Sequence, residues 1–453
     1  MLSKQLKMNR LLSGFLNKKI FFLWVMWGSL ERPSVLIARH LSCDTSAQVA
    51  LLINAETGKV LFAKNAEMPC YPASTTKIAT ALYTLYRKGE SLDQVVTASS
   101  DAVGAVSIQD RRWSGKHPSY RLEFGGSHMG LKVNEQVDVK SLLYGLMLPS
   151  GNDAANVLAE AISGSPSQFV QELNGFLKEI GCKGTHFTNP HGLPDDEHVT
   201  TAKDLALMAQ QAMKHPIFRE IVSSAQCIRP RTNKQPESIL TQNNALVKPG
   251  SKFFYPYATG IKTGYTIKSG HTIVASAQKN NRSLIAVVCH FEGGAQRYRS
   301  AIQLFEAAFQ EVQQTRKLFS ERDDRFSQQI HGAKDLLRGM LKQDVVVSFY
   351  PSEEGSFVSR LEWKELPLPI RAGEEVGLML ILDEGGGVVQ KTPILAIKDV
   401  LPTFSYQVQE KMRLGVAWFQ MQKVYVGYGL AVLFLGGAFY RFFSLRRRNV
   451  DLQ

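Results

Sequence analysis

A serine followed three residues later by a lysine is the first pair of side chains in this chain that could do chemistry together. Ser74 and Lys77 lie in the string YPASTTK, residues 71–77, and apolar residues then recur at helical spacing. Residues three apart lie on one face of a helix, so the Lys77 amine can reach the Ser74 hydroxyl. A lysine activates a serine when burial or a neighbouring positive charge lowers the lysine pKa. The pair therefore predicts a nucleophilic serine with a lysine as its base.

Two further short motifs carry polar side chains suited to the same chemistry. Ser150 and Asn152 flank a glycine in a tight connection between two expected helices, where a hydroxyl and an amide can relay a proton and hold a substrate amide. Lys262, Thr263 and Gly264 lie on an expected edge strand and offer a positive charge, a hydroxyl and close backbone approach. Each motif alone is common, but the three in this order are far more specific.

The spacing of apolar residues predicts an α/β domain over residues 47–314. Strands are expected at both ends of this domain, over 47–54 and 59–63 and over 271–277 and 283–291. Helices are expected over 74–88, 139–148, 153–162, 167–180, 201–214 and 296–314. This order predicts an antiparallel sheet covered by helices, with a large helical insert. Residues 100–137 show no clear period.

The rest of the chain predicts a second, smaller domain. Charged, irregular sequence over 315–324 is typical of a linker, and short β-rich runs separated by turn residues over 325–400 predict a small all-β domain. Residues 401–423 are expected to connect it to the C-terminus, and part of this connector could form an amphipathic helix.

Positive charge is concentrated at the chain ends, so the net charge of +13 does not indicate nucleic-acid binding. A basic start followed by an apolar run predicts a signal sequence or anchor over residues 1–46. A charge-free run followed by arginines predicts a transmembrane or membrane-anchoring helix over 424–443. A buried core helix and a helix lying on the membrane surface are alternatives for that run. The positive-inside rule places everything before it outside the cytoplasm, on the inner membrane of the cell.

The order S-x-x-K, S-x-N, K-T-G resembles the signature of the penicillin-binding proteins and serine β-lactamases. More closely, the chain resembles the D-alanyl-D-alanine carboxypeptidases, the low-molecular-mass penicillin-binding proteins. The strings PASTTK at 72–77, SGNDA at 150–154, NPHGL at 189–193 and GIKTGYT at 260–266 carry this resemblance. It covers residues 47–314 and extends to a β-rich C-terminal domain and a C-terminal membrane attachment.

The resemblance implies that Ser74 attacks the carbonyl of the penultimate D-alanine of a peptidoglycan stem peptide, with Lys77 as general base. Ser150 would assist proton transfer, and the backbone N–H groups of Ser74 and Tyr265 would form the oxyanion hole. Lys77 must be neutral to accept a proton, so we expect burial and the charge of Lys262 to lower its pKa. Water would then release the shortened peptide, and β-lactam antibiotics would acylate the same serine.

The resemblance also supplies a set of substrate-binding candidates. These are Asn152, Lys262, Thr263, Gly264, Tyr265, His191 and Arg297, with Arg299 competing for the role of Arg297. No metal or organic cofactor is called for, and the five cysteines lack metal-ligand spacing. Two alternatives to a carboxypeptidase are a serine β-lactamase and a non-catalytic cell-wall binding or scaffold protein. The sequence assigns no oligomeric state.

Overall fold

The computed structural model describes residues 41–89, 91–415, 428, 431–433, 435–439 and 441 of the 453-residue chain. The first 40 residues of the expected leader segment 1–46 lie outside these ranges, as does half of the expected membrane helix 424–443. Within the described ranges, no helix is long and apolar enough to cross a membrane.

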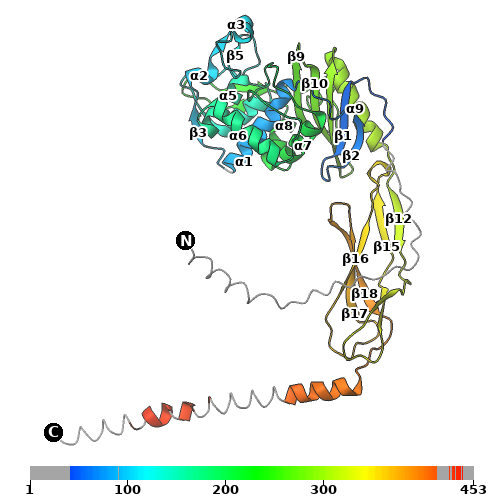
Figure 1. Ribbon diagram of the computed structural model, residues 1–453. Helices are drawn as coiled ribbons and strands as arrows, with labels where there is room; N and C mark the ends of the chain where they lie inside the picture. Colours follow the sequence, from blue (N-terminus) through cyan, green and yellow to red (C-terminus); the bar gives the residue numbers. More distant parts are fainter. Residues whose placement is uncertain are drawn as a thin grey trace, which may run out of the picture. The chain divides into compact units, whose positions relative to one another are not determined.

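Five antiparallel strands form the central sheet in the order β2-β1-β11-β10-β9 (Figure 1). The strands are β1 (Val49–Asn54), β2 (Val60–Lys64), β9 (Ala258–Thr266), β10 (Gly270–Lys279) and β11 (Arg282–Phe291). β11 pairs with β1 on one side and with β10 on the other, so strands from both ends of the region join in one sheet. The expected α/β arrangement with an antiparallel sheet is confirmed.

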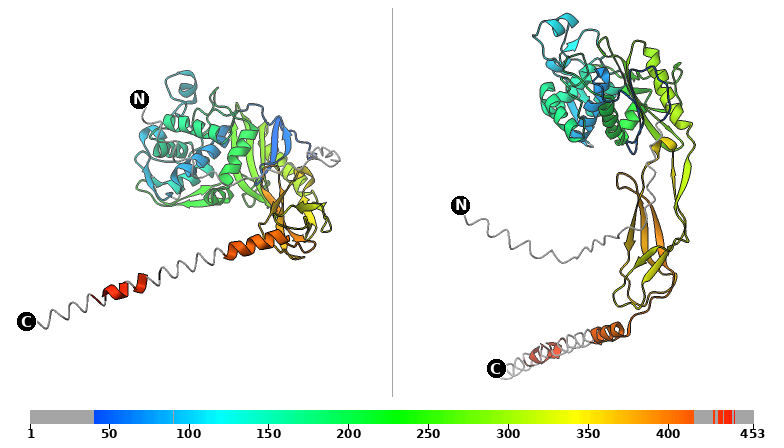
Figure 2. Two further views of the ribbon diagram at one scale, coloured as in Figure 1. Left: turned by 60° about the horizontal axis from the view of Figure 1, so that its bottom comes forward. Right: turned by 45° about the vertical axis from the view of Figure 1, so that its right-hand side comes forward.

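Helices cover both faces of this sheet because its strands are apolar on both sides. Leu51 and Ile53 of β1 pack into one hydrophobic core, while Leu52 packs into another, as the two-residue period of a strand requires. On the first face, α7 (Ala202–Met213) and α8 (Pro216–Ser223) pack against the strands. The helices that complete the same core are α1 (Lys77–Lys88), α4 (Val139–Met147), α5 (Asn152–Ser163) and α6 (Pro166–Glu179). On the second face, α9 (Gly294–Phe309) contributes Leu304 and Phe305, and Figure 2 shows both helical layers from further sides.

Side-chain caps set the starts of several of these helices. The Asp138 carboxylate accepts the Ser141 N–H at the start of α4, and the Thr201 hydroxyl accepts the Asp204 N–H at the start of α7. α5 has no side-chain cap, and the Asn152 N–H instead donates to a backbone carbonyl outside the helix. The start of α5 is therefore held by tertiary contacts, and this is where one of the three motifs lies.

Three segments differ from the sequence-based expectations. Ser74 lies in the 3₁₀ turn η1 (Ala73–Thr76), and the α-helix begins only at Lys77. α9 ends at Phe309, and β12 (Gln314–Phe319) follows where a linker was expected over 315–324. β12 pairs with β15 of the β-rich region and its last residues pack on that region's core, so the linker prediction is wrong for residues 315–319. Helix α8 and the hairpin of β7 (Gln226–Arg229) and β8 (Ser238–Thr241) have no counterpart among the expected elements.

Residues 95–138, which include the segment without a clear sequence period, fold as a set of very short elements. They are β3 (Val95–Thr97), α2 (Ser100–Val103), β4 (Ala105–Val106), α3 (Ile108–Trp113), β5 (Leu122–Glu123) and β6 (Gln136–Asp138). β3 pairs with β6, and β4 pairs in parallel with β5, which lies beside α3 in Figure 1. Elements of two to six residues are too short to show a period, so tertiary contacts must define them.

The β-rich region has its own sheet and its own apolar core. Its sheet runs in the order β13-β14-β18-β17-β16, beside the β12–β15 pair. The further strands are β13 (Phe326–Gln328), β14 (Leu337–Leu341), β15 (Val345–Phe349), β16 (Val358–Trp363), β17 (Glu375–Leu382) and β18 (Val388–Ala396). Residues 404–415 after it are helical, within the expected connector 401–423.

The buried carboxylate of Asp153, in the first turn of α5, fixes the backbone beside the SGN motif. One oxygen accepts the N–H groups of Met129 and Ala154, and the other accepts those of Gly130 and Leu131, each at 2.9 Å. The Asp153 residue is 3% exposed, so water cannot replace these bonds. This carboxylate therefore ties the end of the short-element segment to the helix that carries Asn152.

We expect Asp153→Ala to lower the free energy of unfolding by about 2–4 kcal/mol, because it leaves several buried N–H groups without an acceptor. Urea unfolding at neutral pH measures this change. The matched control is Asp399→Ala, which removes an exposed carboxylate paired with Arg371 and should lower the free energy of unfolding far less. Equal losses in the two variants would contradict the role given to Asp153.

Candidate active site

The three motifs expected to act together meet around one lysine. The Lys77 Nζ atom lies 3.1 Å from Ser74 Oγ and 2.7 Å from Asn152 Oδ1. The K-T-G strand β9 runs directly against the serine turn, since a Cβ on Gly264 would lie 2.9 Å from the carbonyl oxygen of Pro72. The fold thus brings η1, the α4–α5 connection and the edge strand β9 to one place.

Lys77 is completely buried and has a third partner that the motifs do not reveal, the carbonyl oxygen of His191 at 2.7 Å. Burial lowers the pKa of Lys77 well below its usual range, the nearby Lys262 lowers it further, and Asp153 opposes the shift. The expected depression of the pKa is confirmed, with burial as its larger cause. A neutral amine has two protons and one lone pair. If it donates to Asn152 and to His191, its lone pair is left for the Ser74 hydroxyl.

Lys262 is the second buried amine of the site. The residue is 1% exposed, and the only acceptor recorded for its Nζ among the described residues is the carbonyl oxygen of the adjacent Thr263, at 3.2 Å. Burial, and then the charge of Arg297, lower the pKa of Lys262 to about 7. Because this buried amine has so few hydrogen-bond partners, a bound carboxylate would stabilise its charged form.

The Ser150 hydroxyl has no hydrogen-bond partner among the described residues. Its backbone φ is +69°, which is uncommon for a residue other than glycine, and its Oγ atom is buried and unbonded. Strained backbone and unsatisfied polar atoms concentrate at functional sites. Both observations fit a hydroxyl that acts on a bound substrate.

A second strained residue, Ala73, directly precedes the nucleophile candidate at φ +50°. Gly192, at φ +90°, packs on it so closely that a Cβ at this glycine would overlap the carbonyl oxygen of Ala73. The hydroxyl of Thr76 also donates to that carbonyl, at 2.9 Å. The NPHGL loop is thus pressed against the serine turn. Sequence reasoning did not single out Gly192, although the glycine in that string was the available signal.

The side chain of His191, an expected substrate-binding residue, makes its hydrogen bonds to the backbone in this structure, and its contact with a substrate stays a prediction. The residue is completely buried. Its Nε2 lies 3.1 Å from the Tyr120 carbonyl oxygen, and its Nδ1 accepts the Leu193 N–H at 3.2 Å. Burial is the main cause that holds the pKa of His191 well below its usual range, so the ring is neutral. The part of His191 that faces the site is its carbonyl group.

Arg297, rather than Arg299, lies beside the K-T-G strand. Its guanidinium donates to the carbonyl oxygen of Gly264 at 3.0 Å and to the Tyr298 hydroxyl at 3.1 Å, and its buried Nε has no partner among the described residues. Arg299 is exposed. Tyr265 is 56% exposed, so its side chain lies open at the end of the same strand.

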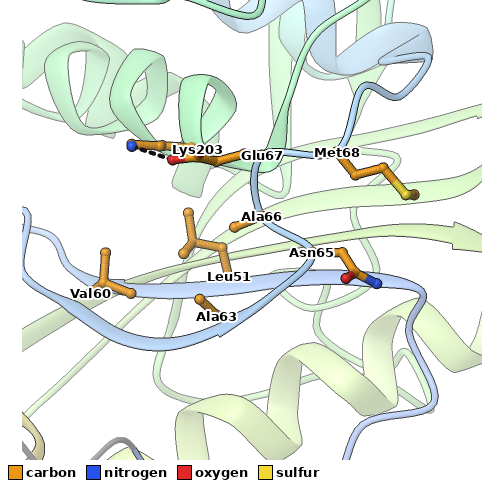
Figure 3. A pocket seen from close by; sticks show the side chains of 8 residues that line it. All are labelled: Leu51, Val60, Ala63, Asn65, Ala66, Glu67, Met68 and Lys203. Carbon is orange, nitrogen blue, oxygen red and sulfur yellow. Dashed lines mark hydrogen bonds and ion pairs between the residues drawn. The ribbon is translucent and has the colours of Figure 1, made fainter.

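Two cavities help to delimit the site. One of about 230 Å³ adjoins Asn152 and is lined on its other sides by residues 122–132, including Ser127 and His128. The other, of about 530 Å³, lies between β1, β2 and the start of α7 and contains the Glu67–Lys203 ion pair (Figure 3). No residue of the three motifs lines the second cavity, so only the first can extend the catalytic site. Among the described residues, no cluster of His, Cys, Asp or Glu could hold a metal ion.

The lowered pKa of Lys262 predicts a pH-dependent stability. Between about pH 7 and 10.5 the unfolded chain binds more protons at this lysine than the folded chain, so the free energy of unfolding rises with pH over this window. Lys77 acts in the same direction. Lys262→Met should flatten the rise measured by urea unfolding. Lys391→Met, on the exposed side of β18, is the control, and the idea fails if Lys262→Met and wild type give parallel profiles.

Comparison with known proteins places this geometry in context. A family model described as D-alanyl-D-alanine carboxypeptidase, peptidase S11, matches residues 36–292. The chain is 31% identical over 358 residues to the D-alanyl-D-alanine carboxypeptidase DacF of Bacillus subtilis, covering 78% of this chain and 86% of that protein. It is 27% identical to DacA of Haemophilus influenzae, over 75% of this chain and 82% of that one.

Solved structures agree in fold. Penicillin-binding protein 5 from Haemophilus influenzae matches with a TM-score of 0.53 and 26% identity, covering 80% of this chain and 99% of that one. The D-alanyl-D-alanine carboxypeptidase DacD from Francisella tularensis matches with a TM-score of 0.55 and 22% identity, over 81% and 97% of the two chains.

Proposed function

The chain belongs to the D-alanyl-D-alanine carboxypeptidases of peptidase family S11, and we propose that Ser74 is its nucleophile and Lys77 its general base. The protein is a serine-type D-alanyl-D-alanine carboxypeptidase, which removes the terminal D-alanine from peptidoglycan stem peptides through an acyl-enzyme and is inhibited by penicillin. The observation that carries the assignment of residues is the 3.1 Å approach of the buried Lys77 amine to the Ser74 hydroxyl.

In the acylation step, the Ser74 oxygen bonds to the carbonyl carbon of the penultimate D-alanine as its proton passes to Lys77. The oxyanion would be held by the N–H groups of Ser74 and Tyr265, because β9 lies against the serine turn. The C–N bond then breaks, and the leaving amine of the terminal D-alanine takes a proton. We assign the transfer of that proton from Lys77 to Ser150, because its buried hydroxyl has no partner among the described residues.

Substrate binding would use the opposite wall of the site. The Asn152 amide can hold a peptide amide while its oxygen accepts from Lys77. The terminal carboxylate would lie against Lys262 and Thr263, with Arg297 behind Gly264 contributing positive charge. Water, deprotonated by Lys77, then hydrolyses the ester and releases the shortened peptide.

The expected outcome for Ser74→Ala is complete loss of covalent labelling by fluorescent penicillin and of D-alanine release from a pentapeptide, because no acyl-enzyme can form. Labelling gels and a D-alanine assay measure both. Ser348→Ala, on the exposed side of β15, should leave both activities unchanged. Rapid turnover of penicillin by the wild type would instead indicate a β-lactamase, and an unlabelled wild type would indicate a non-catalytic binding protein.

We also propose that residues 424–443 attach the enzyme to the inner membrane with the catalytic region on its extracytoplasmic side, and that residues 1–46 direct export. The support is the charge-free run followed by arginines, together with a substrate that lies outside the cytoplasm. Truncation after residue 415 should move the enzyme from the membrane fraction to the soluble fraction while penicillin labelling persists. Retention of the truncated enzyme in the membrane fraction would contradict the assignment.

A further inference from the structure

The short helix α3 carries a buried arginine, Arg111, whose side chain is only 3% exposed. Its guanidinium reaches two separate parts of the chain, the segment 119–123 and Pro194. Nε donates to the carbonyl oxygen of Arg121 at 2.8 Å, and one terminal nitrogen donates to that of Ser119 at 2.6 Å. The other donates to the carbonyl oxygen of Pro194 at 3.0 Å and to the Glu123 carboxylate at 3.2 Å.

The two carbonyls that Arg111 holds near β5 bracket Tyr120. The Tyr120 carbonyl accepts from the Asn156 amide at 3.0 Å and lies 3.1 Å from His191 Nε2. Because Leu193 donates its N–H to the other ring nitrogen, the His191 ring is the donor to Tyr120. The position of the segment 119–121 therefore sets the position of His191.

The same guanidinium also holds the far end of the NPHGL loop through Pro194. Within the loop, the Asn189 side chain accepts the Gly192 N–H at 2.7 Å and donates to the Leu193 carbonyl at 3.0 Å. The loop is thus internally braced and then attached to α3 at one end and to Tyr120 at His191. Its one bond to the catalytic amine is the His191 carbonyl, 2.7 Å from Lys77 Nζ.

We propose that Arg111 is a positioning residue for the lysine base: it holds residues 119–121 and Pro194 in one frame, and this frame fixes the His191 carbonyl against Lys77. Arg111 touches neither the reacting atoms nor the Ser74 turn. Through this frame Arg111 sets the direction of the Lys77 lone pair. The lone pair faces Ser74 only while one amine proton is hydrogen-bonded to the carbonyl oxygen of His191. This role rests on the proposed function of Lys77.

A point charge would not replace this arginine. The guanidinium presents five N–H donors in a rigid plane, and Arg111 uses them on four acceptors in different directions. A lysine at this position could satisfy only part of the set. The neighbouring Arg112 contacts the same Glu123 carboxylate but no carbonyl of the frame among the described residues. Arg112 is therefore a matched control of equal charge on the same helix.

The test measures acylation of the full chain by a fluorescent penicillin in stopped flow, which separates the non-covalent dissociation constant from the acylation rate constant. For Arg111→Ala we expect the rate constant to fall by about 10- to 100-fold, since a misplaced catalytic group costs this much, with the dissociation constant nearly unchanged. Arg111→Lys should recover part of the rate, and Arg112→Ala should match the wild type.

Wild-type rate constants in both Arg111 variants would overturn the proposal. The proposal would also be overturned if Arg111→Ala only reduced the fraction of molecules that can be labelled, while those molecules reacted at the wild-type rate. That result would indicate a purely structural role. If Arg111→Ala gives no folded protein, the decision falls on Arg111→Lys: a rate at least about fivefold lower supports the proposal, and a normal rate overturns it. An unlabelled wild type would overturn the proposed function instead.

Discussion

The catalytic region depends on keeping one amine, that of Lys77, buried and neutral beside a hydroxyl. Water would protonate this lysine at physiological pH, so the site must exclude it, and the completely buried side chain shows that it does. Exclusion of water leaves the two amine protons in need of acceptors. Asn152 and the carbonyl of His191 supply them from two different segments, an α-helix start and a loop. The α4–α5 connection, the NPHGL loop and the short elements around α3 can be understood as supports for these two acceptors.

This arrangement is obtained at the expense of local stability. Ala73 and Ser150 have backbone conformations that disfavour a side chain, and Lys262 lies buried with little to compensate its charge. Each of these features is energetically unfavourable for the residue concerned. Such conflicts persist only where the surrounding fold enforces them. Here the enforcing contacts include Gly192 packed on the serine turn and Asp153 holding four backbone N–H groups.

The side-chain chemistry of the site could be predicted from the sequence, but its backbone chemistry could not. Ser74 and Lys77 are neighbours on one turn, so their spacing alone indicates their contact. The carbonyl of His191 has no residue-type signature, because every residue has a carbonyl, so its contact with Lys77 could not be predicted. The sheet and the long helices follow from apolar periods of two and of about 3.6 residues. The region of Arg111 does not, since its elements are shorter than one period and are defined by hydrogen bonds to distant carbonyls.

The two buried lysines also bear on the order of events. The Lys262 pKa lies near neutrality, so this amine is only partly protonated before a ligand arrives. A carboxylate bound against it would raise its pKa and fix its positive charge. That charge is one of the two causes that lower the pKa of Lys77, whereas the bound carboxylate carries the opposite charge and raises it, as Asp153 does. If Lys262 binds the substrate carboxylate as proposed, the two opposite charges largely cancel at Lys77, so burial remains the main cause that keeps the Lys77 amine neutral during the reaction.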